Sequence, residues 1–248
     1  GHKVRHIIKD KNGRVFWKTE GSVPLEISSD ENEYLNKVAI GIKNQKICRA
    51  EECFSVESPE LWDIENPHLY KVTTELMDST GTVIDSIEQN FGFKTAEFHK
   101  ENGFFLNGRH VKIYGACHHH DQGALGAAFD KNAFRRQLNK LKEMGVNSVR
   151  CSHNPPPKGW MDLCDEMGIL VDDEAFDMWE KPKTHYDYSN FFNEWSPKDT
   201  ASWIRRDRSH VCVFMWSIGN EIYDTHQGNG LEITKKLVKF VRQSDTLK

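Results

Sequence analysis

The chain has 248 residues, which is enough for one large domain or two domains of ordinary size. Hydrophobic residues make up 38% and charged residues 28% of it, values that are typical of globular proteins and argue against a disordered or fibrous class. The formal net charge of −4 is not gathered in blocks, which argues against a nucleic-acid partner, and no apolar run is long enough to span a membrane as a helix.

The six cysteines do not form a metal or disulfide pattern. They are Cys48, Cys53, Cys117, Cys151, Cys164 and Cys212. No two have the spacing of paired zinc ligands, and their density is far below that of a small disulfide-rich domain. Several lie in apolar stretches typical of strands, so we expect reduced thiols in the core. The first residues lack the apolar stretch of a secretory signal, and the sequence leaves the compartment open.

Residues 1–98 have the pattern of β-structure throughout. Residues 4–8 and 14–17 are typical of strands, and the turn residues at 10–13 between them predict a hairpin. Further strands are expected at 33–42, 69–77 and 83–93. Short strands separated by turns, without helical periodicity, indicate an antiparallel sandwich.

From residue 99 the pattern changes to alternating strands and helices. An apolar stretch at 111–117, expected to be a buried strand, precedes a helix that Asp130 caps and Gly145 ends. Further strands are expected at 146–153, 169–171 and 211–218, and further helices at 160–167, from the cap and first-turn pair Ser196 and Pro197 onward, and at 231–242. Four alternations indicate a parallel sheet with helices outside, the first half of an eightfold barrel.

Each predicted parallel strand ends in polar residues. The four ends carry HHHD at 118–121, RCSHN at 150–154, DE at 173–174 and NE at 220–221. Packing alone does not explain titratable groups at the end of every apolar strand. Because active sites of such barrels lie at the carboxyl ends of the strands, this recurrence predicts an active site there.

Each of these groups also has a structural interpretation. The three histidines suggest a metal site, but consecutive strand residues point to alternate faces, so at most two could reach one ion. Arg150 and Asp173 could form an inward ion pair that holds the barrel together. The pair Asn220 and Glu221 is harder to explain by packing, because a carboxylate beside an amide can meet a substrate oxygen. Trp216 is near enough to the same edge to stack on a sugar ring, although tryptophans more often pack in cores.

Seven segments have an order and spacing typical of one enzyme family. They are NGFFLNG at 102–108, GACHHHD at 115–121, VRCSHNP at 149–155, LCDEMG at 163–168, DEA at 173–175, RDRSH at 206–210 and WSIGNE at 216–221. They resemble glycoside hydrolase family 2, which contains β-galactosidase, β-glucuronidase and β-mannosidase, and most of all β-galactosidase. Upstream, LW at 61–62, NPHLY at 66–70 and FGF at 91–93 are similar to the family's immunoglobulin-like domain.

The resemblance implies an immunoglobulin-like β-sandwich at 1–98 and the first half of a (β/α)8 TIM barrel at 99–248. It assigns the general acid/base to Glu221 and the substrate-binding group to Asn220, His119 and His153, with Arg150 and Glu174 as the polar framework beneath them. The position of Trp216 adds one more substrate-binding candidate. Asn220 is expected to hydrogen-bond the 2-hydroxyl of the sugar. The family's nucleophile is a second glutamate at the end of the seventh barrel strand, which lies beyond these 248 residues.

The sequence departs from the family pattern in three ways. The family's N-terminal jelly-roll domain is missing from these residues, and so is the nucleophile. Metal-dependent relatives carry glutamate and histidine ligands after DEA, and residues 176–180 do not reproduce them, so neither magnesium nor another cofactor is expected. The usual proline after His210 is also replaced.

We therefore expect retaining hydrolysis of terminal β-D-galactosides, with a β-linked oligosaccharide or glycoside as the partner and no activity in the isolated chain. Activity as a β-glucuronidase or β-mannosidase, and a non-catalytic carbohydrate-binding or scaffold module, are the alternatives. Half a barrel exposes two strand edges, so we also expect self-association as a homo-oligomer or pairing with further segments.

Overall fold

The computed structural model describes residues 1–22, 53, 55–226 and 228–245. The strand expected at 33–42 and Cys48 lie outside these residues. The chain divides into two compact units, residues 1–60 with 68–93 and residues 61–67 with 94–248. The division between domains at residue 98 stays a prediction. No helix within the described ranges is long and apolar enough to cross a membrane.

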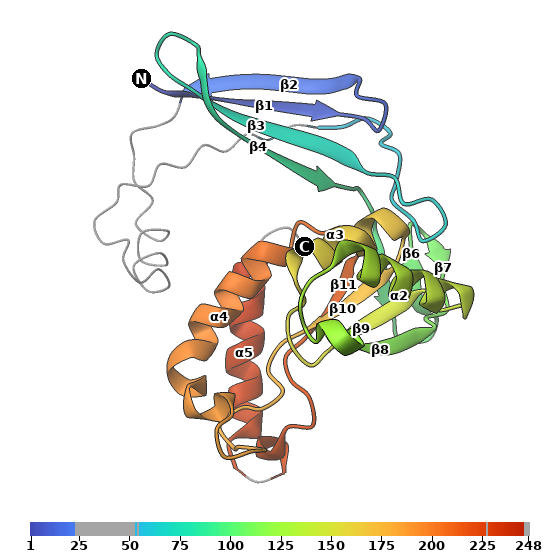
Figure 1. Ribbon diagram of the computed structural model, residues 1–248, viewed down its shortest axis with the longest axis vertical. Helices are drawn as coiled ribbons and strands as arrows, with labels where there is room; N and C mark the ends of the chain where they lie inside the picture. The colour runs from blue at the N-terminus through green and yellow to red at the C-terminus, as the bar shows by residue number, and fades with distance from the viewer. Residues whose placement is uncertain (23–52, 54, 227, 246–248) are drawn as a thin grey trace. The chain divides into compact units, whose positions relative to one another are not determined.

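The first unit contains a four-stranded antiparallel sheet (Figure 1). Its strands are β1 (Lys3–Lys9), β2 (Val15–Ser22), β3 (Tyr70–Met77) and β4 (Val83–Phe91), in the order β2-β1-β3-β4. In the turn between β1 and β2, the Asp10 carboxylate accepts hydrogen bonds from the backbone N–H groups of Asn12 and Arg14, both at 2.9 Å. Gly13 there has φ +79°, a conformation that glycine adopts without strain. The expected hairpin is confirmed.

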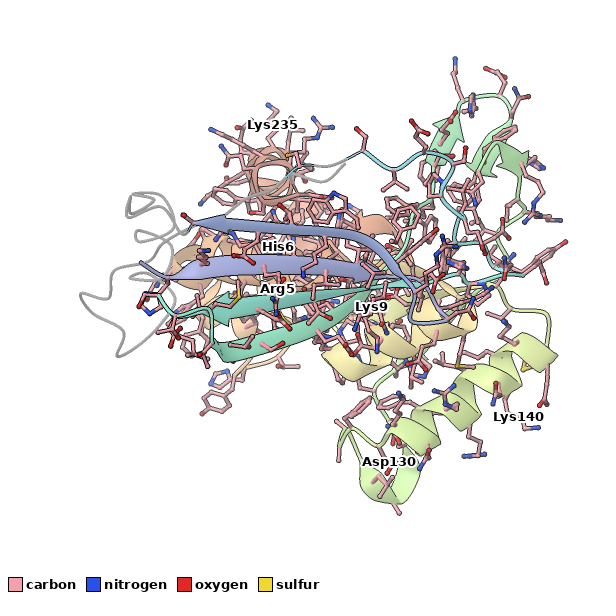
Figure 2. The ribbon with its side chains drawn as sticks, turned by 90° about the horizontal axis from the view of Figure 1, so that it is seen from above. Arg5, His6, Lys9, Asp130, Lys140 and Lys235 are labelled. Atoms are coloured by element: carbon pink, nitrogen blue, oxygen red, sulfur yellow. The ribbon has the colours of Figure 1, made fainter. Side chains whose placement is uncertain are left out.

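Side chains on both faces of this sheet join β1 to β3. Arg5 and His6 follow each other in β1 (Figure 2). Arg5 pairs with Glu75 directly opposite, and His6 lies 3.0 Å from the hydroxyl of Thr74. Because neighbouring strand residues point to opposite faces, these two contacts stabilise the strand pair from both sides. Tyr70 lies at the centre of an aromatic cluster, with ring centroids of Phe16, Phe91 and Phe93 within 5.7 Å.

The second unit is built around a parallel sheet with the order β11-β10-β9-β8. Its strands are β8 (Gly115–His119), β9 (Ser148–Ser152), β10 (Leu170–Glu174) and β11 (Val213–Ser217). Between them and after them run α2 (Lys131–Glu143), α3 (Lys158–Met167), α4 (Phe192–Asp207) and α5 (Gly230–Ser244), with short 3-10 turns at Gly123–Leu125, Tyr188–Asn190 and Tyr223–Thr225. A small antiparallel sheet of β5 (Ala96–His99), β6 (Gly103–Leu106) and β7 (Arg109–His110) precedes β8.

Local sequence explains where α2 begins and which face it buries. The Asp130 side chain accepts a hydrogen bond from the Ala133 N–H at 2.8 Å, as an N-cap does. Lys140, in the last turn, lies at the opposite end of the helix, where a cation stabilises the helix dipole (Figure 2). Phe134 and Leu138, four residues apart, are fully buried.

Helices α4 and α5 run side by side (Figure 1). A hydrophobic cluster, which we call the second core to distinguish it from the buried face of α2, joins them to the ends of the sheet strands. Its members are Ala175, Phe176, Trp179, Phe192, Trp203, Ile204, Ile222, Ile233, Leu237 and Val241. This core takes residues from the loops after β10 and β11 as well as from the helices. It therefore anchors the carboxyl ends of both strands.

Two sequence expectations were wrong in detail. The stretch 111–117 is not one buried strand, since β8 begins at Gly115 and the Cys117 side chain is exposed. Helix α4 begins at Phe192, so Ser196 and Pro197 lie inside it and do not start it. The reason is tertiary, because Phe192 is buried in the second core and the preceding 3-10 turn leads the chain directly into a helix.

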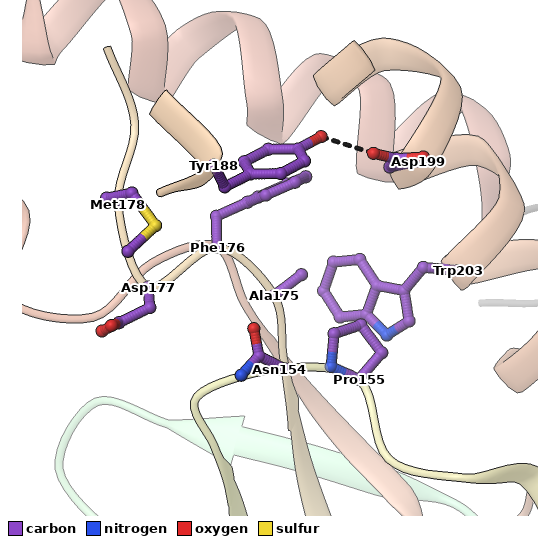
Figure 3. A pocket seen from close by; sticks show the side chains of 9 residues that line it. All are labelled: Asn154, Pro155, Ala175, Phe176, Asp177, Met178, Tyr188, Asp199 and Trp203. Carbon is purple, nitrogen blue, oxygen red and sulfur yellow. Dashed lines mark hydrogen bonds between the residues drawn. The ribbon is translucent and has the colours of Figure 1, made fainter. Parts of the chain in front are cut away.

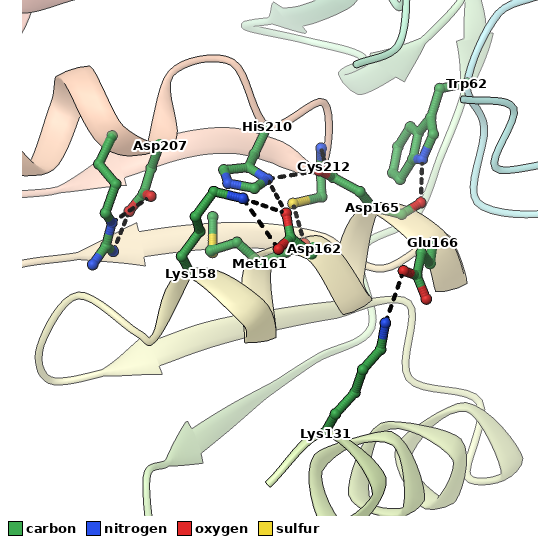
Figure 4. A network of polar contacts seen from close by, with 11 residues as sticks. Trp62, Lys131, Lys158, Met161, Asp162, Asp165, Glu166, Asp207, His210 and Cys212 are labelled. Carbon is green, nitrogen blue, oxygen red and sulfur yellow. Dashed lines mark hydrogen bonds and ion pairs between the residues drawn. The ribbon is translucent and has the colours of Figure 1, made fainter. Parts of the chain in front are cut away.

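Near the N-terminal end of β11, a buried aspartate joins three segments (Figure 4). The carboxylate of Asp165 in α3 accepts hydrogen bonds from Nδ1 of His210 at 2.6 Å and from the Cys212 N–H at 2.8 Å. The backbone carbonyl of Asp165 accepts from the indole N–H of Trp62 at 2.8 Å. This network fixes the start of the strand that leads to Asn220 and Glu221.

Candidate active site

A buried glutamate organises the carboxyl end of the parallel sheet. Glu174, at the end of β10, is fully buried. Its carboxylate accepts hydrogen bonds from Nε of Arg150 at 2.8 Å and from the hydroxyl of Ser217 at 2.5 Å, and lies 2.8 Å from Nδ1 of His153. The side chains of four residues, Arg150, His153, Glu174 and Ser217, thus meet at the ends of three neighbouring strands. A buried carboxylate is tolerated because every oxygen is paired.

The three consecutive histidines diverge, as strand alternation requires. The His119 ring packs edge-on against His153, with centroids 5.3 Å apart. The His118 ring turns to the helix side, where it lies 5.3 Å from the Trp160 ring and 3.3 Å from the Gln137 amide oxygen. Burial is the main cause that lowers the pKa of His118, so the neutral ring suits its apolar surroundings. His119 alone of these three joins the Glu174 group.

Asn220 uses all four of its polar groups within the protein. Its Oδ1 accepts from Arg150 at 2.9 Å, and its Nδ2 donates to Asp177 at 2.8 Å. Its backbone N–H donates to the Phe176 carbonyl at 3.2 Å, and its backbone carbonyl accepts from Nζ of Lys183 at 2.9 Å. The side-chain amide is therefore held in one orientation, with its second N–H left over for a ligand.

Glu221 directly follows this fixed asparagine. Its side chain is exposed, whereas the next residue, Ile222, is buried in the second core. Glu221 has φ +45°, which is uncommon for a residue other than glycine, and Phe176 after β10 has φ +71°. Such backbone conformations persist only where surrounding contacts impose them, and they gather at functional sites.

The structure does not bring Trp216 to this group. Its indole packs perpendicular to Trp203 of α4, with ring centroids 5.2 Å apart, and donates to Asp245 at 2.8 Å. The indole N–H of Trp203 in turn donates to the Asp173 carboxylate of β10, on the face of the sheet that α4 covers. Because Trp216 and Ser217 are neighbours in β11, the side chain of Ser217 on the Glu174 face places Trp216 on the helix face. We therefore leave Trp216 out of the candidate site.

Three residues of the site were missed by the sequence interpretation. Ser217 lies in the segment WSIGNE, three positions before Asn220, and Asp177 follows Glu174 by only three residues, so both could have been found near the strand ends. Lys183 lies nine residues after β10 and carries no sequence signal. Desolvation works to raise the pKa of Asp177, but hydrogen bonds from Lys183 and Asn220 outweigh it, and the pKa is lowered.

Next to this group, a pocket of about 240 Å³ opens between the loops after β9 and β10 and helix α4 (Figure 3). It is lined by Asn154, Pro155, Ala175, Phe176, Asp177, Met178, Tyr188, Asp199 and Trp203. The Tyr188 hydroxyl donates to Asp199 at 2.5 Å across its upper side. The pocket shares Asp177 with the Asn220 group.

Comparison with known proteins identifies the family. The model of the glycosyl hydrolases family 2 TIM barrel domain matches residues 98–247, and a second family 2 model matches residues 2–94. The chain belongs to glycosyl hydrolases family 2. A crystal structure of a family 2 member from Bacteroides cellulosilyticus is 37% identical, with a TM-score of 0.84, and the match covers all of this chain and 30% of that one. The expected order of an immunoglobulin-like sandwich and part of a TIM barrel is confirmed.

Curated relatives carry two activity names. The β-galactosidase BoGH2A of Bacteroides ovatus is 51% identical over 170 residues, which are 68% of this chain and 20% of that protein. A Formosa agariphila protein named "Putative beta-glucuronidase" is 40% identical over 213 residues, which are 85% of this chain and 20% of that protein. The chain thus spans about a fifth of the length of these family 2 relatives.

In the described part of this family 2 site, an ammonium group already occupies two oxygens of the kind that a hard cation prefers. One Asp177 carboxylate oxygen and the Asn220 carbonyl both accept from Nζ of Lys183. Within the described part of the chain, one group of three acidic or histidine side chains has ligand spacing, Asp162, Asp165 and His210. There the hydrogen bonds from His210, Cys212 and Lys158 already use the carboxylates.

Asp172, on the Glu174 face of β10, makes stability depend on pH. Burial, and next the nearby Glu174, raise its pKa to about 6 from a usual 3.8. The folded chain thus binds more protons than the unfolded chain between these values, so stability falls as pH rises through this window. We expect Asp172→Asn to raise the free energy of unfolding of residues 1–248 by about 1–3 kcal/mol at pH 8.

Urea denaturation at several pH values checks this prediction. The difference between Asp172→Asn and the parent chain should shrink below pH 6 and be small at pH 4, where the carboxyl group is protonated in the folded chain and close to its titration midpoint in the unfolded chain. A constant difference between pH 4 and pH 8 would contradict the titration of Asp172 as the cause.

Proposed function

We propose that this chain supplies half of the active site of a retaining β-galactosidase, with Glu221 as general acid/base. The observation that carries the proposal is the set of four hydrogen bonds that fix Asn220, the residue directly before the exposed Glu221, at the carboxyl end of the sheet. Catalysis requires groups that are held in place before substrate binds. Few structural roles need a fully bonded asparagine followed by an exposed carboxylate in a left-handed conformation.

In this proposal Glu221 acts twice. It first donates a proton to the glycosidic oxygen as the bond to the sugar breaks, while the nucleophilic carboxylate forms a glycosyl-enzyme ester. It then takes a proton from water, which attacks the anomeric carbon and releases the sugar with retained configuration. The nucleophile belongs to a barrel strand beyond these residues, at about 5 Å from Glu221.

The neighbouring residues have supporting roles in the proposal. The second N–H of the Asn220 amide donates to the 2-hydroxyl of the sugar, a bond that strengthens as charge develops. His119 and His153 line the sugar site with donors and acceptors for ring hydroxyls. Arg150 and Glu174 do not contact the sugar; they hold Asn220 and His153 in place.

The choice of a galactoside rests on a similar protein, because the groups that would recognise the carboxylate of a glucuronide lie outside these residues. The Bacteroides ovatus relative, 51% identical over 170 residues, is named a β-galactosidase. β-Glucuronidase activity is the second candidate, because a Formosa agariphila relative carries that name.

The proposal is tested with a polypeptide that joins residues 1–248 to the rest of a family 2 catalytic domain, which we call the complete-barrel protein. It is assayed with aryl β-D-galactosides, β-D-glucuronides and β-D-mannosides. We expect the largest kcat/KM for the galactoside. A larger value for the glucuronide or mannoside would reject the proposed sugar, and no turnover of any glycoside would favour a binding or scaffold module.

Residues 1–248 alone are expected to be inactive. Retaining hydrolysis needs a nucleophile and a proton donor about 5 Å apart, and only the proposed proton donor is in this chain. The purified chain is incubated with 4-nitrophenyl β-D-galactoside and the release of nitrophenol is followed. Turnover that Glu221→Gly abolishes would show that the chain provides both groups, contrary to the proposal.

A further inference from the structure

The loop after β10 wraps over the end of β11. Three of its groups reach residues 218–224: the Trp179 indole donates to the Ile218 carbonyl at 2.8 Å, the Lys181 N–H to the Asp224 carboxylate at 3.2 Å, and Nζ of Lys183 to the Asn220 carbonyl at 2.9 Å. These contacts bracket the turn that carries Glu221. The conformation of one loop is thereby tied to the position of the proposed proton donor.

Lys183 is the centre of this contact. Only 15% of its side chain is exposed, and its ammonium group lies 2.8 Å from Asp177 Oδ1, the same oxygen that accepts from the Asn220 side chain. The loop itself is folded by Asp187, whose carboxylate accepts from the Lys183 N–H at 2.7 Å and the Thr184 N–H at 2.8 Å. The lysine is therefore placed by its own loop and does not depend on a ligand.

The turn at Asn220 and Glu221 needs such support. A non-glycine residue at φ +45° costs free energy that surrounding contacts must offset. Without the ammonium group, the Asn220 carbonyl would lose its acceptor bond and the Asp177 carboxylate its counter-charge. The turn could then relax toward an ordinary conformation, which would move the Glu221 carboxyl away from the glycosidic oxygen.

We propose that Lys183 and Asp177 are positioning residues that hold Asn220 and Glu221 for catalysis, and that the Lys183 ammonium group takes the place of a divalent metal ion at this corner of the site. This inference rests on the proposed role of Glu221. The ammonium group offers three N–H donors to fixed oxygens and a charge that no chelator can remove.

The test compares two leaving groups in the complete-barrel protein. Phenol is a poor leaving group and needs a proton as it departs, whereas 2,4-dinitrophenol departs with little help. A loss of acid catalysis therefore lowers kcat/KM for phenyl β-D-galactoside far more than for 2,4-dinitrophenyl β-D-galactoside, whereas a loss of sugar binding lowers both equally. Lys183→Met is expected to lower kcat/KM for the phenyl galactoside about 10- to 100-fold and that for the dinitrophenyl galactoside less than about 3-fold. Lys183→Arg, which keeps the charge, is expected to recover part of the loss.

Lys198→Met is the matched control, because Lys198 is also a largely buried lysine, 22% exposed and 3.0 Å from Glu194, but lies on α4. It should leave both rates unchanged, and EDTA should not affect the parent protein. An equal loss on both substrates, a loss confined to glucuronides, or an EDTA-sensitive activity that Mg²⁺ restores would each overturn the inference.

Failure of the inference and failure of the proposed function give different results. If Glu221→Gly shows the selective loss on phenyl galactoside and Lys183→Met does not, Glu221 is the proton donor and Lys183 does not position it. If Glu221→Gly shows no selective loss, the proposed function itself fails. Thermal unfolding of residues 1–248 carrying Lys183→Met establishes that the variant is folded.

Discussion

Glu221→Gly is expected to lower kcat/KM of the complete-barrel protein for phenyl β-D-galactoside by about 10²- to 10⁴-fold, the range of general acid catalysis. Glycine is the suitable replacement because it adopts φ +45° without strain, so the variant removes the carboxyl group and leaves the backbone turn intact. The Asn220 contacts do not involve the Glu221 side chain and should persist. The thermal midpoint of residues 1–248 should therefore not fall.

Azide distinguishes the acid/base from the nucleophile in this variant. With 2,4-dinitrophenyl galactoside the glycosyl-enzyme ester still forms, but it is hydrolysed slowly without a base. Azide attacks the anomeric carbon, displaces the enzyme carboxylate and needs no deprotonation, so it should restore turnover and give a β-galactosyl azide. An α-galactosyl azide would show that Glu221 is the nucleophile. Glu101→Gly, in the exposed turn between β5 and β6, is the control and should change neither rate nor product.

The sequence predicted the order of the elements well because that order rests on local signals. The cap at Asp130, the glycine at Gly168 with φ +68° after α3, and the alternation of strand and helix are each contained in a few residues. The carboxyl-end positions of Arg150, Glu174 and Asn220 followed from the rule that parallel strands end at one edge. Their mutual hydrogen bonds are consistent with that rule.

The remaining features depend on contacts that are distant in sequence. Trp216 and Ser217 both fit either face of β11, and a bulge at Val213–Met215 shifts the register, so strand periodicity could not assign the face of Trp216. Lys183 lies 37 residues from Asn220 in the chain, and no pattern marks their contact. The early start of α4 follows from the burial of Phe192, which only the folded core decides.

Glu174→Ala is expected to lower the free energy of unfolding of residues 1–248 by about 3–5 kcal/mol, because a fully buried carboxylate is removed and the Arg150 guanidinium group loses its paired charge. Arg150, His153 and Ser217 would each lose a bond, and a cavity would remain. Six of the seven tryptophans lie in the second unit, so urea denaturation followed by tryptophan fluorescence reports on this unit.

Two further variants separate the cost of an unpaired charge from the cost of lost packing. Glu174→Met combined with Arg150→Met replaces both charges by apolar groups of similar length and should recover most of the lost stability, since an apolar pair is often as stable as a buried ion pair. Glu143→Ala removes an exposed partner of Lys140 and should change stability by no more than about 0.5 kcal/mol. If the double variant were as unstable as Glu174→Ala, the loss would come from packing and from Ser217 and His153, and the unpaired Arg150 would not be its cause.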